Sequence, residues 1–174
     1  MNKAEMRLKL ESQHQDLMSF LKNMKEEQIH IQKDGKWSAI QNVDHLLKSI
    51  KVVNSAVHKP SILLRSAFGK PNREARSYEG LVQRYRERLA DRTADAPKEY
   101  QAADSKELDV PTVLKEYDKE VQRFLKFVKK VKDRKLDGTL LPHPLLGKLL
   151  MREILYFMHF HTNHHFEAIK KTQS

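Results

Sequence analysis

The chain has 174 residues and a formal net charge of +10, with 33 Lys and Arg against 23 Asp and Glu, and its length predicts one domain over residues 1–174. It contains no cysteine, which excludes disulfides and thiolate ligands, so a metal ion would need nitrogen or oxygen donors. No apolar run approaches the roughly 18 residues that cross a bilayer, and the polar first residues do not resemble a signal peptide, so we expect a cytoplasmic protein that does not enter the membrane.

Apolar residues at helical spacing dominate the first third of the chain. They predict a helix over residues 3–27 and a connection over residues 28–37. Ser38 and Gln41 form a capping box, with Trp37 before it as an apolar staple. The capping box opens a second helix that runs to about residue 58, where Pro60 stops it.

The middle of the chain is less regular. It contains a short apolar segment over residues 62–68 and an amphipathic helix of about four turns from Tyr78 to Leu89. Residues 94–109 are polar and predict a loop.

The last third of the chain again has helical spacing. A helix opens at Pro111 and ends at residues 137–138, residues 142–144 are extended, and a final helix runs over about 147–171. No alternating strand pattern occurs. The predicted fold is all-α, a four-helix bundle with an extra helix in the long crossover between the second and third long helices.

Two histidines near the C-terminus carry the clearest chemical signal. His161 and His165 are four residues apart, so both rings project from one face of the final helix. Buried imidazoles need partners, and a bound metal ion is the obvious one. From spacing alone, two hydrogen-bonded core histidines explain the pair equally well. The pair continues an apolar stripe formed by Leu150, Ile154, Phe157 and Met158.

A third ligand would have to come from another helix, and His45 is the candidate that we favour. It lies opposite the main apolar stripe of the second helix, on an arc of small side chains that leaves room for another helix or a ligand. This arc borders charged residues, so a partly exposed surface histidine is the alternative. The other members of the arc are Ser38, Asn42, Ser49, Val52 and Ala56.

Three other histidines have simpler interpretations. His14 lies beside the apolar stripe of the first helix and is expected to be a core histidine held by one hydrogen bond. His159 points away from the core and should be solvated. His143, in the extended stretch before Pro144, is expected to be structural.

No general base stands out. Glu153 and His164 are candidates, and His164 either lines the site or faces a neighbouring helix. The HExxH motif of metalloproteases is absent, because Thr162 stands where its glutamate would be.

Two sets of residues resemble signatures of the DinB-like superfamily. One lies at the C-terminus and the other in the second helix, so together they bracket most of the chain. The closest subgroup is that of the YfiT-like metal-dependent hydrolases. The matching residues are His143-Pro144-x-x-Gly147-x-Leu149, Glu153 and His161-x-x-His164-His165-x-x-x-Ile169, and earlier Trp37-Ser38 followed by His45-Leu46.

The resemblance implies an up-down-down-up four-helix bundle that often forms a homodimer. It implies a divalent metal ion (Ni, Zn or Fe) bound by His45, His161 and His165. It also implies hydrolysis, or transfer that depends on a low-molecular-weight thiol cosubstrate. The chain departs from its relatives in its basic charge and at Ala168, where glutamine is common and could hydrogen-bond a ligand.

Three functions therefore remain open. The first is a metal-dependent enzyme, a hydrolase or a thiol S-transferase, acting on a small molecule. The second is a non-catalytic module that uses its positive charge, clustered over residues 126–135, to bind an anionic ligand or nucleic acid. Nucleic acid is disfavoured because no helix-turn-helix, zinc finger or interleaved aromatic residue is visible. The third is a bundle whose histidines are polar core residues without a metal ion.

Overall fold

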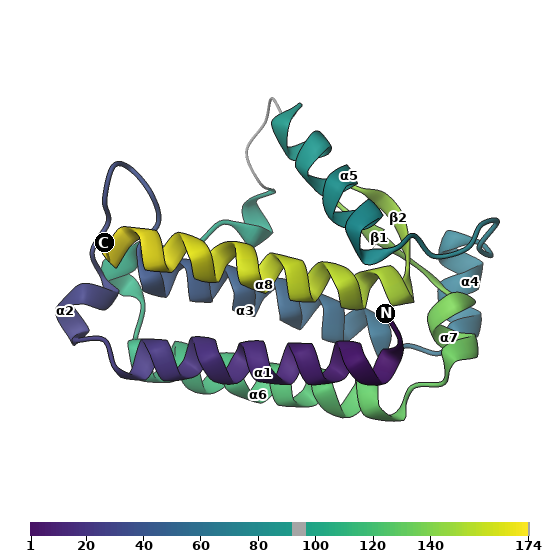
Figure 1. Ribbon diagram of the computed structural model, residues 1–174, viewed down its shortest axis with the longest axis horizontal. Coiled ribbons are helices and arrows are strands. Elements are labelled where there is room, and N and C mark those ends of the chain that lie inside the picture. The colour runs from purple at the N-terminus through teal and green to yellow at the C-terminus, as the bar shows by residue number, and fades with distance from the viewer. Residues whose placement is uncertain (92–96, 174) are drawn as a thin grey trace.

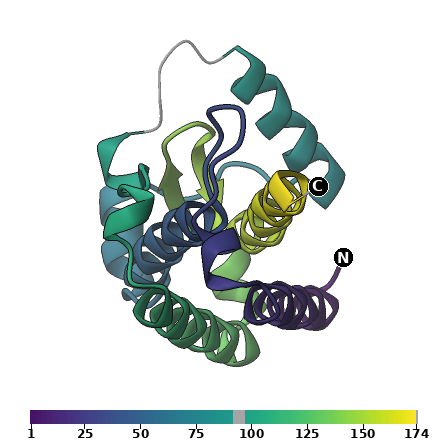
Figure 2. The ribbon, with the colours of Figure 1, turned by 90° about the vertical axis from the view of Figure 1, so that its left-hand side faces the viewer.

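Four long helices form a bundle in the computed structural model, which describes residues 1–91 and 97–173. Helices α1 and α8 run in one direction and α3 and α6 in the other, which gives the up-down-down-up order (Figure 1). Viewed end-on, α1 and α3 occupy opposite corners, and each packs against both α6 and α8 (Figure 2). The predicted four-helix bundle is confirmed. The bounds are α1 Lys3–Lys22, α3 Ala39–Val57, α6 Val110–Lys130 and α8 Met151–Gln173.

The predicted capping box at the start of α3 is present. The backbone N–H of Gln41 donates to the Ser38 hydroxyl at 3.3 Å, and the Ser38 N–H donates to the Gln41 side chain at 3.0 Å. These bonds fix the first turn of α3 and, with it, the position of every side chain on the following arc. Because α3 packs against α6 and α8 and also contacts a short 3₁₀ helix, η1 (Lys98–Tyr100), it is buried on more than one side.

Two predicted helices are shorter than expected. The first ends at Lys22, and a separate short helix, α2 (Glu26–Ile29), follows it. The helix predicted to reach residue 137 ends at Lys130, because Val131 and Lys132 have extended backbone conformations before α7 (Asp133–Asp137) begins. The side chain of Val131 is buried at this break, which allows the chain to turn without exposing an apolar residue.

Two short strands occur where the sequence showed no alternating strand pattern. Strands β1 (Leu140–His143) and β2 (Gly147–Leu150) form an antiparallel hairpin, with Leu140 opposite Leu150 and His143 opposite Gly147. The last helix therefore begins at Met151 and not near residue 147. Four-residue strands are too short to show alternation, and the two leucines that end β2 continue the helical stripe of α8 in sequence.

The crossover between α3 and α6 covers one side of the bundle. Helix α4 (Ser61–Phe68) packs on β1, and α5 (Tyr78–Ala90) packs on α8 (Figure 1). The amphipathic helix predicted over residues 78–89 is confirmed as α5. The polar stretch 94–109 contains η1 and a second 3₁₀ turn, η2 (Ser105–Glu107), while its residues 94–96 lie outside the described residues. None of the described helices is both long and apolar enough to cross a membrane.

A buried carboxylate ties the crossover to the start of α8. The side chain of Glu153 is fully buried, and both of its oxygens accept from the Arg73 guanidinium at 2.7 Å. Backbone N–H groups of Arg76 and Leu150 also donate to it, each at 2.9 Å. Burial alone would raise the pKa of Glu153, but these hydrogen bonds outweigh it and hold the pKa below its ordinary value. A carboxylate occupied in this way does not serve as the general base considered from sequence.

We expect Glu153→Gln to lower the free energy of unfolding by roughly 2–4 kcal/mol near neutral pH, because it leaves buried donors without a charged acceptor. The folded-state pKa of Glu153 is lowered, so its contribution is present above the unfolded pKa of about 4.3 and is lost as pH falls further. The difference between wild type and variant should therefore shrink below about pH 4. Urea unfolding of both proteins at several pH values measures this difference in unfolding free energy.

Glu167→Gln is the matched control, since Glu167 lies on the same helix in an exposed ion pair with Lys170. Its effect should stay below about 1 kcal/mol at all pH values. An equal loss of unfolding free energy in the two variants would show that the buried hydrogen bonds of Glu153 stabilise the fold no more than an exposed ion pair does.

Candidate metal centre

Three histidine rings meet between α3 and α8. The Nε2 atom of His161 lies 3.0 Å from Nε2 of His45 and 3.1 Å from Nε2 of His165. One nitrogen from each ring lies within 4.8 Å of the others, and all three residues are buried. The structure therefore brings together the three histidines named from the sequence, although His45 precedes His161 by 116 residues.

The helices explain this convergence. His161 and His165 lie one turn apart on α8, and α8 packs alongside α3, which carries His45. His45 lies off the main apolar stripe of α3, but it is buried because α3 has neighbours on more than one side. The alternative of a partly exposed surface histidine is wrong.

Hydrogen bonds at the far nitrogens orient two of the rings. Nδ1 of His165 lies 2.7 Å from the side-chain oxygen of Asn42, and Nδ1 of His45 contacts the carbonyl oxygen of Tyr100. Both acceptors require an N–H, so both rings carry hydrogen on Nδ1 and present a lone pair at Nε2. The amide nitrogen of Asn42 donates to the carbonyls of Trp37 and Ser38, at 3.2 and 2.9 Å, and this turns its oxygen toward His165.

His161 is the unsatisfied member of the cluster. Its Nδ1 is buried without a hydrogen-bond partner among the described residues, while its Nε2 faces the lone pairs of the other two rings. A metal ion with bonds of about 2.0–2.1 Å would hold two nitrogens about 2.9 Å apart at a right angle and about 3.3 Å apart in a tetrahedron. The observed separations of 3.0 and 3.1 Å lie between these values, so the distances from His161 to each of the other two rings suit a shared cation.

The electrostatic setting keeps the rings neutral, which is the form that binds metals. Burial, followed by the neighbouring histidines, holds the pKa values of His161 and His165 well below the ordinary value. Burial also lowers the pKa of His45, although the Tyr100 carbonyl and Asp44 oppose the shift.

Aromatic rings cover the cluster. Phe157 stacks on His161 with ring centroids 4.8 Å apart, and Trp37 stacks on His165 at 6.2 Å and lies 5.2 Å from His45. Trp37 was expected to act as an apolar staple, but the position on α3 that would receive it is Asn42. The indole therefore packs on the histidine rings.

A cavity of about 340 Å³ adjoins the cluster. His45 and His161 line it, together with Ser49 and Val52 from the small-residue arc predicted to leave room for a ligand. Its outer wall comes from the hairpin, α5 and η1. A molecule in the cavity would thus lie against two of the three converging rings.

The family model described as the DinB superfamily matches residues 9–169. The chain belongs to the DinB superfamily. No curated protein sequence matches it significantly. Two solved structures share the fold of this DinB protein. Each is 18% identical in sequence to it, and each match covers 98% of the 174-residue chain.

One of these structures is TT2238, described as a four-helix bundle protein, with a TM-score of 0.59 over 99% of that chain. The other is YfiT from Bacillus subtilis, described as a probable metal-dependent hydrolase with an unusual four-helix bundle topology, with a TM-score of 0.63 over 85% of that chain. At this identity, the likeness establishes the fold of the DinB protein and not its activity.

The remaining histidines do not belong to the three-ring cluster, although the ring of His164 meets that of His165 edge-on with centroids 5.2 Å apart. His14 is buried and its Nε2 lies 2.7 Å from an Asp118 oxygen, so the predicted core histidine with one hydrogen bond is confirmed. His164 is exposed and does not line the cavity. His159 was expected to be solvated, but it is half-buried and its Nδ1 lies 3.0 Å from the Tyr78 hydroxyl.

Sequence reasoning missed the groups that orient the rings. Asn42 could have been found, since it is a polar residue three positions before His45 on the same small-residue arc. The Tyr100 carbonyl could not, because a backbone oxygen 55 residues away leaves no residue-type signal.

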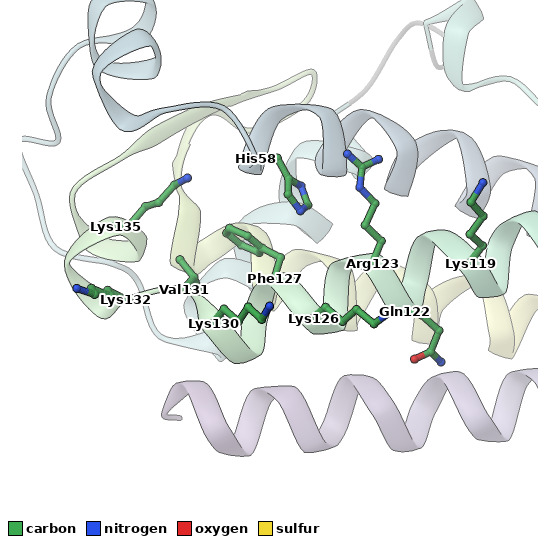
Figure 3. A pocket seen from close by; sticks show the side chains of 10 residues that line it. All are labelled: His58, Lys119, Gln122, Arg123, Lys126, Phe127, Lys130, Val131, Lys132 and Lys135. Atoms are coloured by element: carbon green, nitrogen blue, oxygen red, sulfur yellow. The ribbon is translucent and has the colours of Figure 1, made fainter.

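A separate groove of about 800 Å³ concentrates positive charge along α6 and α7 (Figure 3). It shares no lining residue with the cavity. The groove has one benzene-type ring, Phe127. Its centroid lies 5.3 Å from that of the His58 imidazole and 5.6 Å from Nζ of Lys135, which leaves little free ring surface for base stacking. The ten lining residues include Lys119, Arg123, Lys126, Lys130, Lys132 and Lys135 and no carboxylate.

We expect this DinB protein to bind duplex DNA weakly and through charge alone. The slope of log K against log salt concentration is negative, and changing Lys126 and Lys130 to Glu should reduce its magnitude by about 2, one for each lost phosphate contact. Fluorescence anisotropy at several salt concentrations measures the slope.

The control changes Lys33 and Lys36 to Glu, which alters net charge equally at two exposed positions outside the groove. It should leave the slope nearly unchanged. Sequence-selective binding that resists salt would contradict the expectation.

Proposed function

We propose that this DinB protein is a metal-dependent enzyme acting on a small molecule, with His45, His161 and His165 as ligands of a divalent ion (Ni, Zn or Fe). The observation that carries the proposal is the meeting of three buried, neutral imidazoles at separations of 3.0 and 3.1 Å. Three histidines are a common ligand set for such ions, and they leave positions open for water or substrate.

The alternative, in which the histidines are polar core residues without a metal, explains less. Without a metal, the one hydrogen that Nε2 of His161 can carry would have to serve two facing lone pairs, at 3.0 and 3.1 Å. Asn42 and the Tyr100 carbonyl both act to leave a lone pair at Nε2, which serves metal binding and is otherwise a cost.

A divalent ion at this place would supply Lewis acidity and lower the pKa of a bound water or thiol. The chain's own residues prepare for that chemistry. Asn42 and the Tyr100 carbonyl hold two rings in orientation, and Phe157 and Trp37 exclude water from their faces.

Two reactions are consistent with this arrangement. Hydrolysis would use water, and the description of YfiT as a probable metal-dependent hydrolase supports it. Transfer to a thiol would need a low-molecular-weight thiol cosubstrate, because the chain has no cysteine of its own.

Zinc titration of untagged protein tests the ligand set. We expect one ion per chain in the wild type and in His164→Ala, whose side chain is exposed, and loss of that binding in His161→Ala. Zinc at about 100 times its dissociation constant should raise the free energy of unfolding by about 2.7 kcal/mol.

Calorimetry gives the stoichiometry, and thermal unfolding with and without chelator gives the stabilisation. A wild-type protein that binds no nickel, zinc or iron would refute the proposal. Equal loss of binding in His161→Ala and His164→Ala would refute the assignment of the ligands.

Asn42→Ala tests the orienting hydrogen bond. We expect zinc affinity to fall about 10- to 100-fold, because His165 would lose the acceptor that fixes its tautomer. Ser49→Ala is the matched control, since Ser49 shares the α3 arc and lines the cavity but bonds to none of the rings.

Competition with a chromophoric chelator measures both affinities, and circular dichroism verifies folding. Unchanged affinity in Asn42→Ala would show that the Asn42 contact plays no part in metal binding.

A further inference from the structure

A fourth histidine, His143, stands in the wall of the cavity. It ends β1, where it pairs with Gly147, and it lines the cavity together with His45 and His161. From sequence it was expected to be structural only. Its position beside the candidate metal centre raises the question of which of its nitrogens is available to a ligand.

The hairpin turn determines where the hydrogen of His143 sits. The backbone N–H groups of Leu145 and Leu146 both donate to Nδ1, each at 3.1 Å. A nitrogen that accepts hydrogen bonds carries no proton, so the ring is neutral and its hydrogen is on Nε2. Gly147 closes the turn with a φ of 75°, a conformation that favours glycine. Burial acts in the same direction and lowers the pKa of His143 to about 4.

The Nε2–H group is therefore a donor with no acceptor among the described residues. The ring lines the cavity while its Nδ1 faces its own turn, so we place the opposite edge of the ring, which carries Nε2, toward the cavity. Phe157 meets the ring edge-to-face at 4.3 Å and Tyr85 at 6.3 Å, and these contacts hold the plane of the imidazole.

The rest of the cavity wall is uncharged and largely apolar. None of the described lining residues is Asp, Glu, Lys or Arg, so a charged group lying away from the metal centre would have no counter-charge. The volume of about 340 Å³ is about twice that of the roughly 150 Å³ cavity that suffices for benzene. Apolar residues of the wall include Val52, Val53, Leu145, Ile154 and Phe157.

We propose that the cavity binds a small, largely apolar substrate with one acceptor oxygen, such as a carbonyl, and that His143 Nε2–H donates to that oxygen. This rests on the proposed function, because it takes the substrate of the metal centre to occupy this cavity. His143 then fixes the acceptor oxygen beside His45 and His161 without giving up its proton.

Two substitutions test the roles of the two nitrogens of His143 separately. In His143→Asn, the amide oxygen takes the place of Nδ1 and accepts from the turn, but nothing replaces the Nε2–H. In His143→Gln, the amide nitrogen reaches the position of Nε2 and restores the donor. The probes are acetophenone and α-methylstyrene, which have nearly the same shape but carry an oxygen and a methylene, respectively, at the same position.

Binding is followed by ¹H–¹⁵N NMR of the whole protein, with and without zinc. We expect the imidazole ¹⁵N shifts to show hydrogen on Nε2 of His143, and acetophenone to bind more tightly than α-methylstyrene. His143→Asn should weaken acetophenone binding about three- to tenfold and leave α-methylstyrene binding unchanged. His143→Gln should recover most of the loss.

Three results would overturn the proposal: hydrogen on Nδ1, equal affinity of the wild type for the two probes, or no saturable binding of either probe. If His143→Asn does not fold, the wild-type tautomer and probe selectivity still decide. Zinc stoichiometry on the same samples separates the two proposals. Normal zinc binding without probe selectivity rejects only the role of His143, whereas the absence of zinc, nickel and iron binding rejects the proposed function.

Discussion

The structure depends on holding three buried imidazole rings between α3 and α8 with their Nε2 atoms facing one another. Bare nitrogens lose hydration there, and burial holds their pKa values low, so protonation does not relieve the crowding. The two Nδ1 contacts, to Asn42 and to the Tyr100 carbonyl, commit the rings of His165 and His45 to this arrangement. Two lone pairs therefore face His161, an arrangement that suits the proposed cation.

This constraint explains why the crossover is more than a connection. A four-helix bundle alone would leave the His45 side of α3 open to solvent, because that arc lies off the main apolar stripe. The hairpin, α5 and η1 close over it and form the outer wall of the cavity. Glu153 fastens the crossover to α8 through Arg73 and Arg76, so this wall is fixed to the helix that carries two of the histidines.

Sequence predicted those features of the site whose residues all lie on one helix, because their spacing alone shows which face they share. The spacing of His161 and His165 was enough to place both rings on one buried face. His45 was different, because the pattern of α3 alone favoured a surface position, and the family resemblance turned this candidate into an expected ligand. Its burial depends on neighbours of α3 that no local pattern specifies.

The hairpin escaped prediction for a related reason. Its strands have four residues each, and the buried leucines at the end of β2 have the spacing of the helix that follows. His143 was thus assigned to an irregular loop, with no indication that its ring would line the cavity. The residues that complete the site come mainly from such short elements, whose positions depend on tertiary contacts.

Charge lies in one part of this protein and the cavity in another, so the attraction of molecules from solution and their selection by the cavity depend on different residues. The net charge of +10 is concentrated partly along α6 and α7, in a groove that shares no residue with the histidine cavity. Such a field attracts anions over distances of about 10 Å and weakens as salt is added. The cavity wall is uncharged, so its selection depends on shape, apolar contact and hydrogen bonding, which salt screens little. The basic surface can therefore raise the encounter rate of an anionic molecule without making the cavity selective for anions.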